Sequence, residues 1–590
     1  MLKRKVTLTL LNFAKTDNRK TRNVMGIPAC WLGWKWCLCI VVMVLLSAGH
    51  LYPQTRVRAT NSNYDVNDWQ SYSIARNIVS IALGNQYVYL GSLHSGILRF
   101  DQFQFTWDFP WTTSNGLADN TVWVVAYDKD TGLLWCATQK AICVYNPTAR
   151  RWQNFFKDEI GIPVGDRVES IGIGKSNVFF VTRNQQTFEA NKFGGVILTA
   201  KRKYRNLQVD RSIQWFGKIT QRRQHFPQFF MANGYLFDSS GIIEGPDFRR
   251  AEIISSLEDE WGNFWIGTAG LGAGRGDIQS LQLNMLPFGL ENPSVNALAF
   301  EGDILWIGGT GTGSLNRGIT AWDFNRDEWR SYEQKNITDL YSNEVNAIAV
   351  NGKNVMFATN YGLSQYSAEK NRWRVFDRFD GLSDNQIFDV VVDDSSIWVG
   401  TASGIDRIWK YSLAKKDSVK IDHIIAGDIR LVEVYDLELM KNLLWAGTNN
   451  GIYVYDSRKD EGGFADEIGG PVSKLVTSVS NYGDELWFGS SRGIDVYNVK
   501  KKQWLGVPEA RSFPNTPINQ IVASKYVVWA ATNNGVLKYS RNSKSWRKFT
   551  TADGLISNRV YSILLDGDYV WFGTDRGLTQ FYWNSSHRID

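Results

Sequence analysis

The segment DGLSDNQIFDVVVDDSSIWVGTASGI, residues 380–405, contains a polar loop, two apolar stretches and a turn that includes glycine. Close copies stand at 114–142 (SNGLADNTVWVVAYDKDTGLLWCATQKAI) and at 552–578 (ADGLISNRVYSILLDGDYVWFGTDRGL). Recurrence of one stretch along a chain is the sequence signature of a repeat fold. The repeat therefore has to be measured before any single residue is interpreted.

The LWxGT part of the segment recurs at intervals of 41 to 50 residues, with one gap of 86. Its aromatic residue is at Tyr89, Trp135, Phe179, Trp265, Trp306, Trp398, Trp445, Trp487, Trp529 and Trp571, and Met356 fills the same column. Because 86 is twice the period, we expect a degenerate unit around 229–243. The chain then has twelve units.

Each unit reads as four short strands. A first apolar strand leads to the LWxGT strand, a TxxG turn leads to a third strand, and W-x-x-[FY] marks the fourth. Four strands at this period, with a tryptophan signature, predict an all-β fold of β-propeller blades. The middle of the first strand is small or polar, as at Ser80, Asp389, Asp436 and Ser478, which suits crowding at a propeller axis.

The two ends of the chain complete one blade. The last unit (560–583) has only three strands, and the missing fourth pattern is DWQSYS at 68–73. We expect this N-terminal strand to close the propeller and remove an open sheet edge. Since propellers have about 4–8 blades, twelve units predict two rings, divided 7 plus 5 or 6 plus 6.

The predicted organisation is a basic leader at 1–49, a linker and closing strand at 50–74, an irregular propeller portion at 75–290 and seven regular blades at 291–590. The leader has eight Lys and Arg against one Asp, followed by an apolar run at 37–48. It predicts export, to the periplasm or cell surface, by a cleaved signal peptide or a retained N-terminal anchor. The sequence leaves open whether translation starts at Met1 or at Met25.

Charge excludes one class of partner. The chain carries +6 overall, but the part after the leader carries −1, so no global field attracts nucleic acid. With only five His, none at ligand spacing, the sequence predicts no metal site and no cofactor. No G-x-S-x-G motif is present, so an enzyme is not the favoured class.

Three groups of residues are candidates for a site or a modification. Cys136 and Cys143 flank a tight turn, where a cross-strand disulfide and two core thiols are both open. A basic segment combines Lys201, Arg202, Lys203, Arg205, Arg222 and Arg223 with aromatic residues, and is either a binding loop for an acidic glycan or protein, or a solvated blade edge.

The third group is an asparagine column in the opening loop: Asn120, Asn343, Asn385, Asn519 and Asn558. Asparagine tolerates left-handed backbone and bonds its own chain, so a turn role explains most of this column. The loops should also open on one face of the ring, which makes these residues ligand-face candidates. The glycine-rich stretches 270–276 and 308–318 are predicted to be hairpins, because neither opens a helix.

With LWxGT, TxxGI and DGLxxN identified, the repeats resemble the two-component regulator propeller family over about 75–583. The resemblance implies an exported, sensor-type propeller that binds a ligand such as a glycan or peptide and works with a membrane sensor kinase or an envelope protein. The chain ends at Asp590 without the kinase that such sensors usually carry. Two alternatives stay open: a polysaccharide lyase or hydrolase, and a cell-envelope assembly or secretion accessory.

Overall fold

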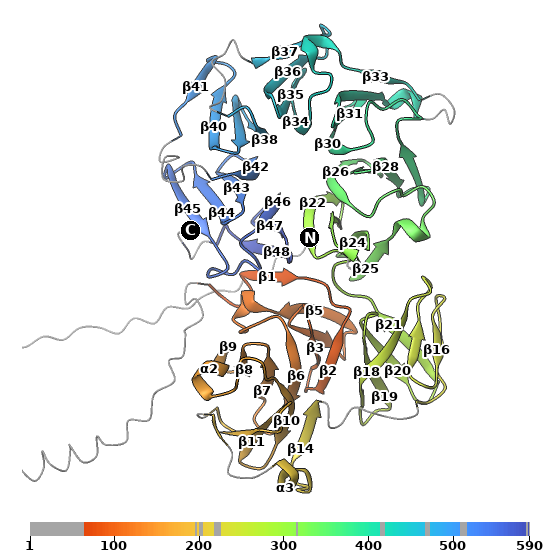
Figure 1. The fold of residues 1–590 in the computed structure, drawn as a ribbon, viewed down its shortest axis with the longest axis vertical. Helices are drawn as coiled ribbons and strands as arrows, with labels where there is room; N and C mark the ends of the chain where they lie inside the picture. Colours follow the sequence, from red (N-terminus) through yellow and green to blue (C-terminus); the bar gives the residue numbers. More distant parts are fainter. Residues whose placement is uncertain are drawn as a thin grey trace, which may run out of the picture. The chain divides into compact units, whose positions relative to one another are not determined.

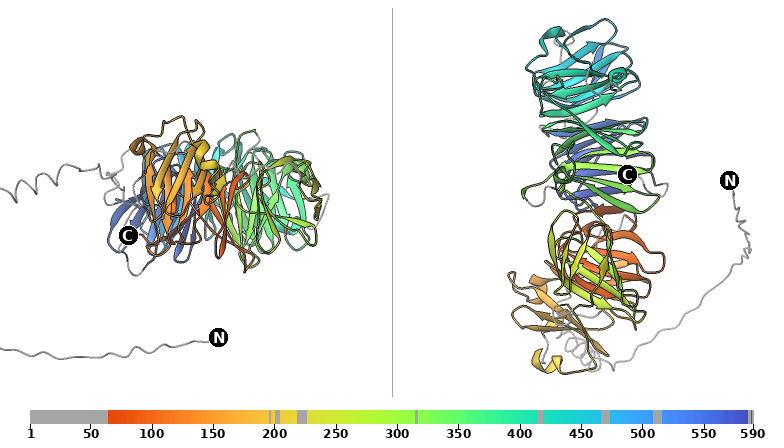
Figure 2. Two further views of the ribbon diagram at one scale, coloured as in Figure 1. Left: turned by 90° about the horizontal axis from the view of Figure 1, so that it is seen from below. Right: turned by 90° about the vertical axis from the view of Figure 1, so that its right-hand side faces the viewer.

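The computed structural model describes residues 64–588 apart from 195–196, 200–203, 218–225, 314–316, 414–418, 466–472, 508–515 and 586–587. The predicted leader and most of the linker lie outside the described residues. Within them, strands form eleven sheets, almost all of whose neighbours are antiparallel (Figure 1). Two further views show that strands, rather than helices, make up the described part (Figure 2).

The N-terminal set is the four sheets between residues 78 and 286. Its first two sheets are β2 (Ile78–Leu83), β3 (Tyr87–Ser92), β4 (Ile97–Asp101), β5 (Thr106–Trp111), and β6 (Val122–Tyr127), β7 (Leu134–Thr138), β8 (Ala141–Asn146), β9 (Arg151–Phe156). The third is β10 (Val168–Ile173), β11 (Asn177–Thr182), β12 (Thr187–Asn191), β13 (Leu198–Thr199) and β14 (Gln214–Gly217). The fourth is β15 (Phe230–Met231), β16 (Leu236–Asp238), β17 (Ile242–Glu244), β18 (Arg250–Glu258), β19 (Asn263–Thr268), β20 (Ala273–Asp277) and β21 (Gln282–Leu286).

The C-terminal set is seven four-stranded sheets. Its first three are β22 (Ser294–Glu301), β23 (Ile304–Thr310), β24 (Ile319–Asp323), β25 (Glu328–Tyr332); β26 (Val345–Asn351), β27 (Asn354–Thr359), β28 (Gly362–Ser367), β29 (Arg372–Phe376); and β30 (Ile387–Val392), β31 (Ser396–Thr401), β32 (Gly404–Trp409), β33 (Ile421–His423). The next three are β34 (Val434–Met440), β35 (Leu443–Thr448), β36 (Gly451–Asp456), β37 (Glu461–Phe464); β38 (Val476–Tyr482), β39 (Glu485–Ser490), β40 (Gly493–Asn498), β41 (Gln503–Leu505); and β42 (Ile518–Ala523), β43 (Val527–Thr532), β44 (Gly535–Ser540), β45 (Ser545–Phe549). The last is β46 (Val560–Asp566), β47 (Tyr569–Thr574), β48 (Gly577–Tyr582) and β1 (Trp69–Tyr72).

Helices in the described residues are short and lie in connections. They are α2 (Lys157–Ile160), α3 (Tyr204–Gln208) and the 3-10 turns η1 (Thr113–Asn115), η3 (Gln334–Asn336), η4 (Lys410–Ser412) and η5 (Ala426–Asp428).

The closing strand lies where the sequence predicts it. β1 pairs antiparallel with β48, and Trp69 is opposite Phe581. Their rings stack with centroids 3.8 Å apart. A strand from the N-terminus thus covers the edge of the last sheet in the chain.

The predicted count of twelve units is wrong for the described residues, which form eleven sheets. Seven lie in the C-terminal set, as expected, but the N-terminal set has four rather than five. Residues 229–243 form no sheet of their own, because β15, β16 and β17 add to the sheet of β18–β21. In the third sheet β14 pairs with the free edge of β10 and also lies against β2 and β6.

Neighbouring sheets are joined at their first strands. Each first strand has a bulge, where its register with the second strand shifts, as between Val476 and Ser478. Where the side chain at the bulge is polar, it can bond the next first strand: Val125 N donates to Ser80 Oγ (3.1 Å), and Ile521 N donates to Ser478 Oγ (3.1 Å). Crowding between strands therefore explains why this column is small or polar.

The same column joins the ends of each set. Ser562 Oγ in β46 donates to Val295 O in β22 (3.3 Å), and Ser255 Oγ in β18 donates to Ile78 O in β2 (3.0 Å). In the C-terminal set the first strands β22, β26, β30, β34, β38, β42 and β46 are innermost (Figure 1).

Tryptophans of the second strand fill the space between sheets. Those of the predicted column are 0–4% exposed: Trp135, Trp265, Trp306, Trp398, Trp445, Trp487, Trp529 and Trp571. Trp529, for example, packs against Phe572 of the next sheet with centroids 5.3 Å apart. Large aromatic side chains at this position bury much apolar area, and Trp306 and Trp398 donate their Nε1–H groups to Glu301 (3.1 Å) and Asp393 (2.7 Å).

Candidate functional site

Four of the five predicted asparagines bond their own loop. The Oδ1 atoms of Asn120, Asn385 and Asn558 each accept the backbone N–H seven residues earlier, at 2.8 Å, 2.9 Å and 2.8 Å. Asn343 Oδ1 accepts the N–H of Gln334 at 2.8 Å. The turn role of these side chains is therefore visible, whereas contact with a ligand stays a prediction.

The backbone of the same asparagines joins each loop to a hairpin. Gly96, Gly362 and Gly535 donate their N–H groups to the carbonyl oxygens of Asn120, Asn385 and Asn558. Each of these glycines has a positive φ, between 67° and 106°, which a side chain would disfavour. The DGLxxN loop and the TxxG turn are therefore one bonded unit.

Asn519 does not belong to this column. It lies inside β42, one residue after the strand begins, and its Nδ2 donates to Val560 O (2.6 Å) in the next sheet. Asn346 in β26 makes the equivalent bond to Ile387 O (2.7 Å). The sequence alignment placed Asn519 wrongly because the preceding loop has Pro517 and no DGLxxN motif.

The predicted basic segment is mostly outside the described residues. Lys201, Arg202, Lys203, Arg222 and Arg223 fall in the ranges that the structure leaves undescribed, and Arg205 is exposed on α3. Binding by this segment stays a prediction.

Cys136 and Cys143 are directly opposite each other on β7 and β8. Both are free thiols and fully buried. Burial, and then the hydrogen bond with Cys143, raise the pKa of the Cys136 thiol well above its usual range. The pairing of the two positions is confirmed, and a disulfide between them stays a prediction.

The structure also contains a cavity of about 190 Å³ where the two sets meet, which we call the junction cavity. Its lining comes from β21 and the loop that follows, from β25, and from the segments around Arg76, Arg249 and Arg317. Trp107, Tyr235, Phe288 and Trp329 supply aromatic surface. Charged side chains make up much of the remaining lining, so this cavity is more polar than the usual small-molecule site.

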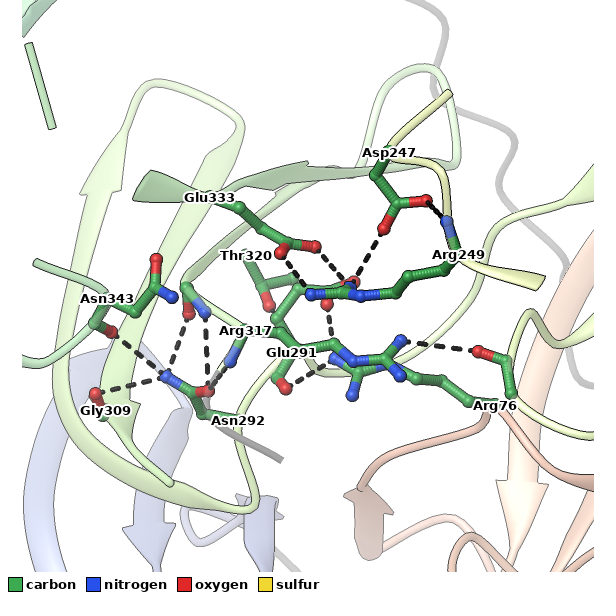
Figure 3. A network of polar contacts seen from close by, with 12 residues as sticks. Arg76, Asp247, Arg249, Glu291, Asn292, Gly309, Arg317, Thr320, Glu333 and Asn343 are labelled. Atoms are coloured by element: carbon green, nitrogen blue, oxygen red, sulfur yellow. Dashed lines mark hydrogen bonds and ion pairs between the residues drawn. The ribbon is translucent and has the colours of Figure 1, made fainter. Parts of the chain in front are cut away.

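Ion pairs surround the junction cavity (Figure 3). Arg249 makes a two-bond fork to Glu333, with Nη1–Oε1 at 2.9 Å and Nη2–Oε2 at 2.7 Å. Asp247 pairs with Arg249 (3.1 Å) and with Lys335 (2.9 Å). Glu333 and Asp247 are therefore occupied by cations of the same network.

Arg76 and Glu291 form the second pair. Arg76 Nη2 bonds both the Glu291 carboxylate and, at 2.6 Å, the Glu291 carbonyl oxygen. The Arg76 side chain is 10% exposed, and its Nη1 atom is buried without a hydrogen-bond partner among the described residues. A buried guanidinium N–H without a partner is costly, and a ligand oxygen would satisfy it.

Arg317 adds positive charge to the same wall. Its backbone is fixed by Asn292 Oδ1, which accepts the Arg317 N–H at 2.8 Å, and its Nη1 donates to Gly270 O at 3.3 Å. Burial, and then the charges of Arg76 and Arg249, lower the pKa of Arg317 to about 10. The guanidinium remains protonated at neutral pH but is placed against two like charges, which an anion would relieve.

The pKa of Glu291 is shifted upward, in the opposite direction to that of Arg317. Burial raises the pKa of this carboxyl, while the charge of Arg76 opposes the rise. The wall therefore holds three arginines close together, with one of the carboxylates desolvated. Such an arrangement can bind an oxyanion group through charge-assisted hydrogen bonds.

Sequence reasoning missed this cavity because its residues come from three sheets, those of β2–β5, β15–β21 and β22–β25, and from the segments that connect them. Two weak signals were present: Glu291 lies in the loop FGLENPSV (288–295), which resembles DGLxxN, and Arg317 lies near the end of the glycine-rich stretch 308–318. Their convergence with Arg76 and Arg249 depends on how the two sets pack, which no local pattern encodes.

Within the described residues, no three His, Cys, Asp or Glu side chains are grouped so as to hold a metal ion. Over the same part of the chain, no helix is both long and apolar enough to cross a membrane.

Comparison with known proteins bears on the repeat. The family model for the two component regulator propeller matches residues 554–576, which include the loop of Asn558 and the strand of Trp571. Residues 554–576 are a two-component regulator propeller repeat. No curated protein matches the chain.

Solved structures with a similar arrangement share little sequence with this propeller. The extracellular domain of a hybrid two-component system, BT4673 from B. thetaiotaomicron, is 17% identical, with 86% of this chain and 70% of that chain covered and a TM-score of 0.43. The corresponding domain of BT3049 from the same organism is 17% identical, with 87% and 69% covered and a TM-score of 0.42. PorZ, a surface component of the type-IX secretion system of Porphyromonas gingivalis, is 13% identical, with 86% and 74% covered and a TM-score of 0.43.

Proposed function

We propose that this protein is an exported, sensor-like propeller that binds an acidic glycan or peptide unit in the junction cavity. The observation that carries the proposal is the buried Nη1 of Arg76, without a partner among the described residues, beside Arg317 in a cavity with aromatic walls. Export rests on the basic leader and apolar run at 1–49.

The size of the cavity narrows the ligand. Drug-sized ligands occupy pockets of about 300–1,000 Å³, whereas this cavity has about 190 Å³. One charged sugar or one acidic side chain fits that space better than a long oligosaccharide, the rest of which would extend into solvent.

Signalling through a separate membrane kinase or envelope protein is the second part of the proposal. It is supported by the repeat at 554–576, because that family model is named for two-component regulators. The immobilised protein is incubated with solubilised envelope, with and without the acidic ligand. Recovery of a kinase, in a larger amount when the acid is bound, would support signalling through a membrane partner. Recovery of secretion or assembly proteins alone, regardless of ligand, would favour the accessory function.

Thermal shift and calorimetry test ligand binding. Glucuronate, a sulfated sugar, a phosphorylated sugar and an acidic peptide are compared with neutral glucose at matched ionic strength. We expect at least one acid to raise the unfolding temperature in a saturable way while glucose does not.

The variant Arg76→Lys keeps a cation for Glu291 but removes Nη1. Loss of a charge-assisted hydrogen bond predicts about tenfold weaker binding of the acid. The matched control is Arg541→Lys, which alters another arginine–glutamate pair, with Glu485 at 2.5 Å, and does not line the cavity. Equal weakening in both variants would overturn the site, and turnover of any glycan would favour the enzyme alternative.

A further inference from the structure

The hairpin that joins β23 to β24 lacks a bond that closes the equivalent hairpins of the C-terminal set. In the other six sheets, a Thr or Ser hydroxyl at the end of the second strand donates to the carbonyl of a glycine, as from Thr401 to Gly404 at 3.0 Å. Gly309, which has no hydroxyl, stands at the equivalent position in the register. A Cβ on Gly309 would lie 1.7 Å from Ser294 O, so no side chain fits there.

Asn292 supplies the missing contacts from the loop before β22 (Figure 3). It is 4% exposed, and its Nδ2 donates to the two sides of the hairpin base, Gly318 O at 3.0 Å and Gly309 O at 3.2 Å. Its Oδ1 accepts the N–H of Arg317 at 2.8 Å and that of Gly318 at 3.4 Å. One buried amide therefore closes the hairpin and holds the backbone of Arg317.

The same amide also replaces a bond between the hairpin and the neighbouring loop. In the next sheet, Gly362 N donates directly to Asn385 O at 2.7 Å. In the sheet of β22–β25 the amide lies between the corresponding groups, because Gly318 N donates to its Oδ1 and its Nδ2 donates to Asn343 O at 3.3 Å. Backbone groups that meet directly in the next sheet are thus connected here through a side chain.

Arg317 carries this connection across to the N-terminal set. Its Nη1 donates to Gly270 O at 3.3 Å. The N–H of Gly270 donates in turn to Arg76 O at 3.0 Å. The two glycine-rich stretches of the sequence therefore meet at the junction, and a chain of hydrogen bonds runs from Asn292 through Arg317 to Arg76.

We propose that Asn292 is the positioning residue of the junction cavity: it fixes the place of Arg317, so that Arg317 and Arg76 bind the acidic group of one ligand together. This inference rests on the function proposed above and adds a residue that does not itself line the cavity, whereas both arginines do. A guanidinium that is held in place before binding loses less conformational freedom when the ligand arrives. Loss of the amide should therefore weaken binding through Arg317.

A double-mutant cycle separates this role from a general structural one. Calorimetry with glucuronate, the sulfated and phosphorylated sugars and the acidic peptide gives dissociation constants for the wild type, Asn292→Ala, Arg317→Ala and the double variant. We expect each single variant to bind about tenfold more weakly, and the double variant to bind no more weakly than Arg317→Ala. Asn292→Gln keeps the amide but displaces it by one methylene, and it should show the same coupling if the alanine variant does not fold.

Asn385→Ala is the matched control, because this asparagine closes an equivalent loop and does not line the cavity. It should lower the unfolding temperature and leave the dissociation constants unchanged. Additive losses in the double variant, or unchanged binding in either single variant, would overturn this inference and leave binding of the acid in place. A wild type that binds none of the four acids would overturn the proposed function and this inference with it.

Discussion

Asparagines that recur at one place in a repeat invite a functional interpretation, but here their oxygens are used by the chain itself. Asn120, Asn385 and Asn558 each close a loop of seven residues through Oδ1. The same residues accept a glycine N–H through the backbone. Recurrence at the residue scale thus reports the geometry of a loop that is made many times.

Replacing Asn120 tests this role. Asn120→Ala leaves the N–H of Thr113 without its acceptor, so we expect the free energy of unfolding to fall by about 1 kcal/mol. Urea unfolding at equilibrium measures the loss. Asn120→Asp keeps an oxygen at the same position and should restore most of it, and an Asp variant as unstable as the Ala variant would contradict the assignment.

Glu438 provides a pH test at a single side chain. Burial, opposed by its bond to Asn481 and aided by the charge of Asp389, raises the pKa of this carboxyl to about 7, above the unfolded value of about 4.3. Its favourable protonated state is therefore lost as pH rises from about 4 through 7. Glu438→Gln should be more stable than the wild type at about pH 8 and equal to it at about pH 4, as measured by urea unfolding.

Removal of one charge elsewhere is the control for this variant. Glu369 is exposed on the turn after β28, so Glu369→Gln should not reproduce the gain at high pH. A gain of the same size in both variants would show that net charge, rather than the position of Glu438, sets the effect.

At the element scale, the fourth strand of the last sheet is the part of the fold with the most unusual connection. Trp69 of β1 is 1% exposed, lies against the rings of Phe581 and Phe549, and packs against Gly554. A Cβ on Gly554 would lie 2.4 Å from the Trp69 ring, and Gly554 has φ of 136°. The DGLxxN loop and the closing strand are thus fitted to each other.

Replacing Trp69 by alanine should strongly lower the free energy of unfolding. Trp69→Ala removes a fully buried aromatic side chain from between two sheets, which predicts a loss of about 3–5 kcal/mol in the free energy of unfolding. Trp261→Ala is the control, because that tryptophan is 58% exposed. Similar losses in the two variants, by urea unfolding, would contradict the packing role of β1.

Most elements could be predicted from the sequence, because each depends on a local pattern. LWxGT identifies a second strand, TxxG a hairpin, and DWQSYS an unpaired fourth strand whose partner can be inferred by counting. Failures occurred where the pattern was absent: 229–243 has hydrophobic residues but no LWxGT, and it joins the edges of an existing sheet. Asn519 was misplaced because the loop before β42 lacks the DGLxxN motif, and Thr516 stands two residues before the strand, where the motif has its asparagine.

On the scale of the whole molecule, the two sets share both chain connections and aromatic packing. Phe288, between β21 and β22, lies against Trp107 of β5 with centroids 4.7 Å apart and against Trp329 of β25 at 5.1 Å. The ion pair of Arg249 and Glu333 joins the two sets as well. Convergence of Arg76, Arg249 and Arg317 arises at this scale, which is why sequence patterns did not reveal the junction cavity.

Fragments test how far the C-terminal set depends on the first strand. Residues 291–588 alone leave the edge of β48 uncovered, so we expect aggregation through that edge. The same fragment with residues 64–73 linked ahead of it should be monomeric and fold cooperatively, as judged by light scattering and thermal unfolding. A monomeric, folded fragment without 64–73 would show that β1 is dispensable.

The pairing of β1 with β48 also sets an order of events in time. Ser71 and Thr579, whose hydroxyls are bonded at 2.8 Å, are separated by 508 residues. At about 5–20 residues per second, the ribosome makes the partner of β1 on the order of 25–100 s after β1 itself. Throughout that interval the strand and Trp69 lack their native partner, and an unpaired strand is a template for pairing with other chains. A chain that ends before β48 never receives its closing partner, so its β1 remains an unpaired strand.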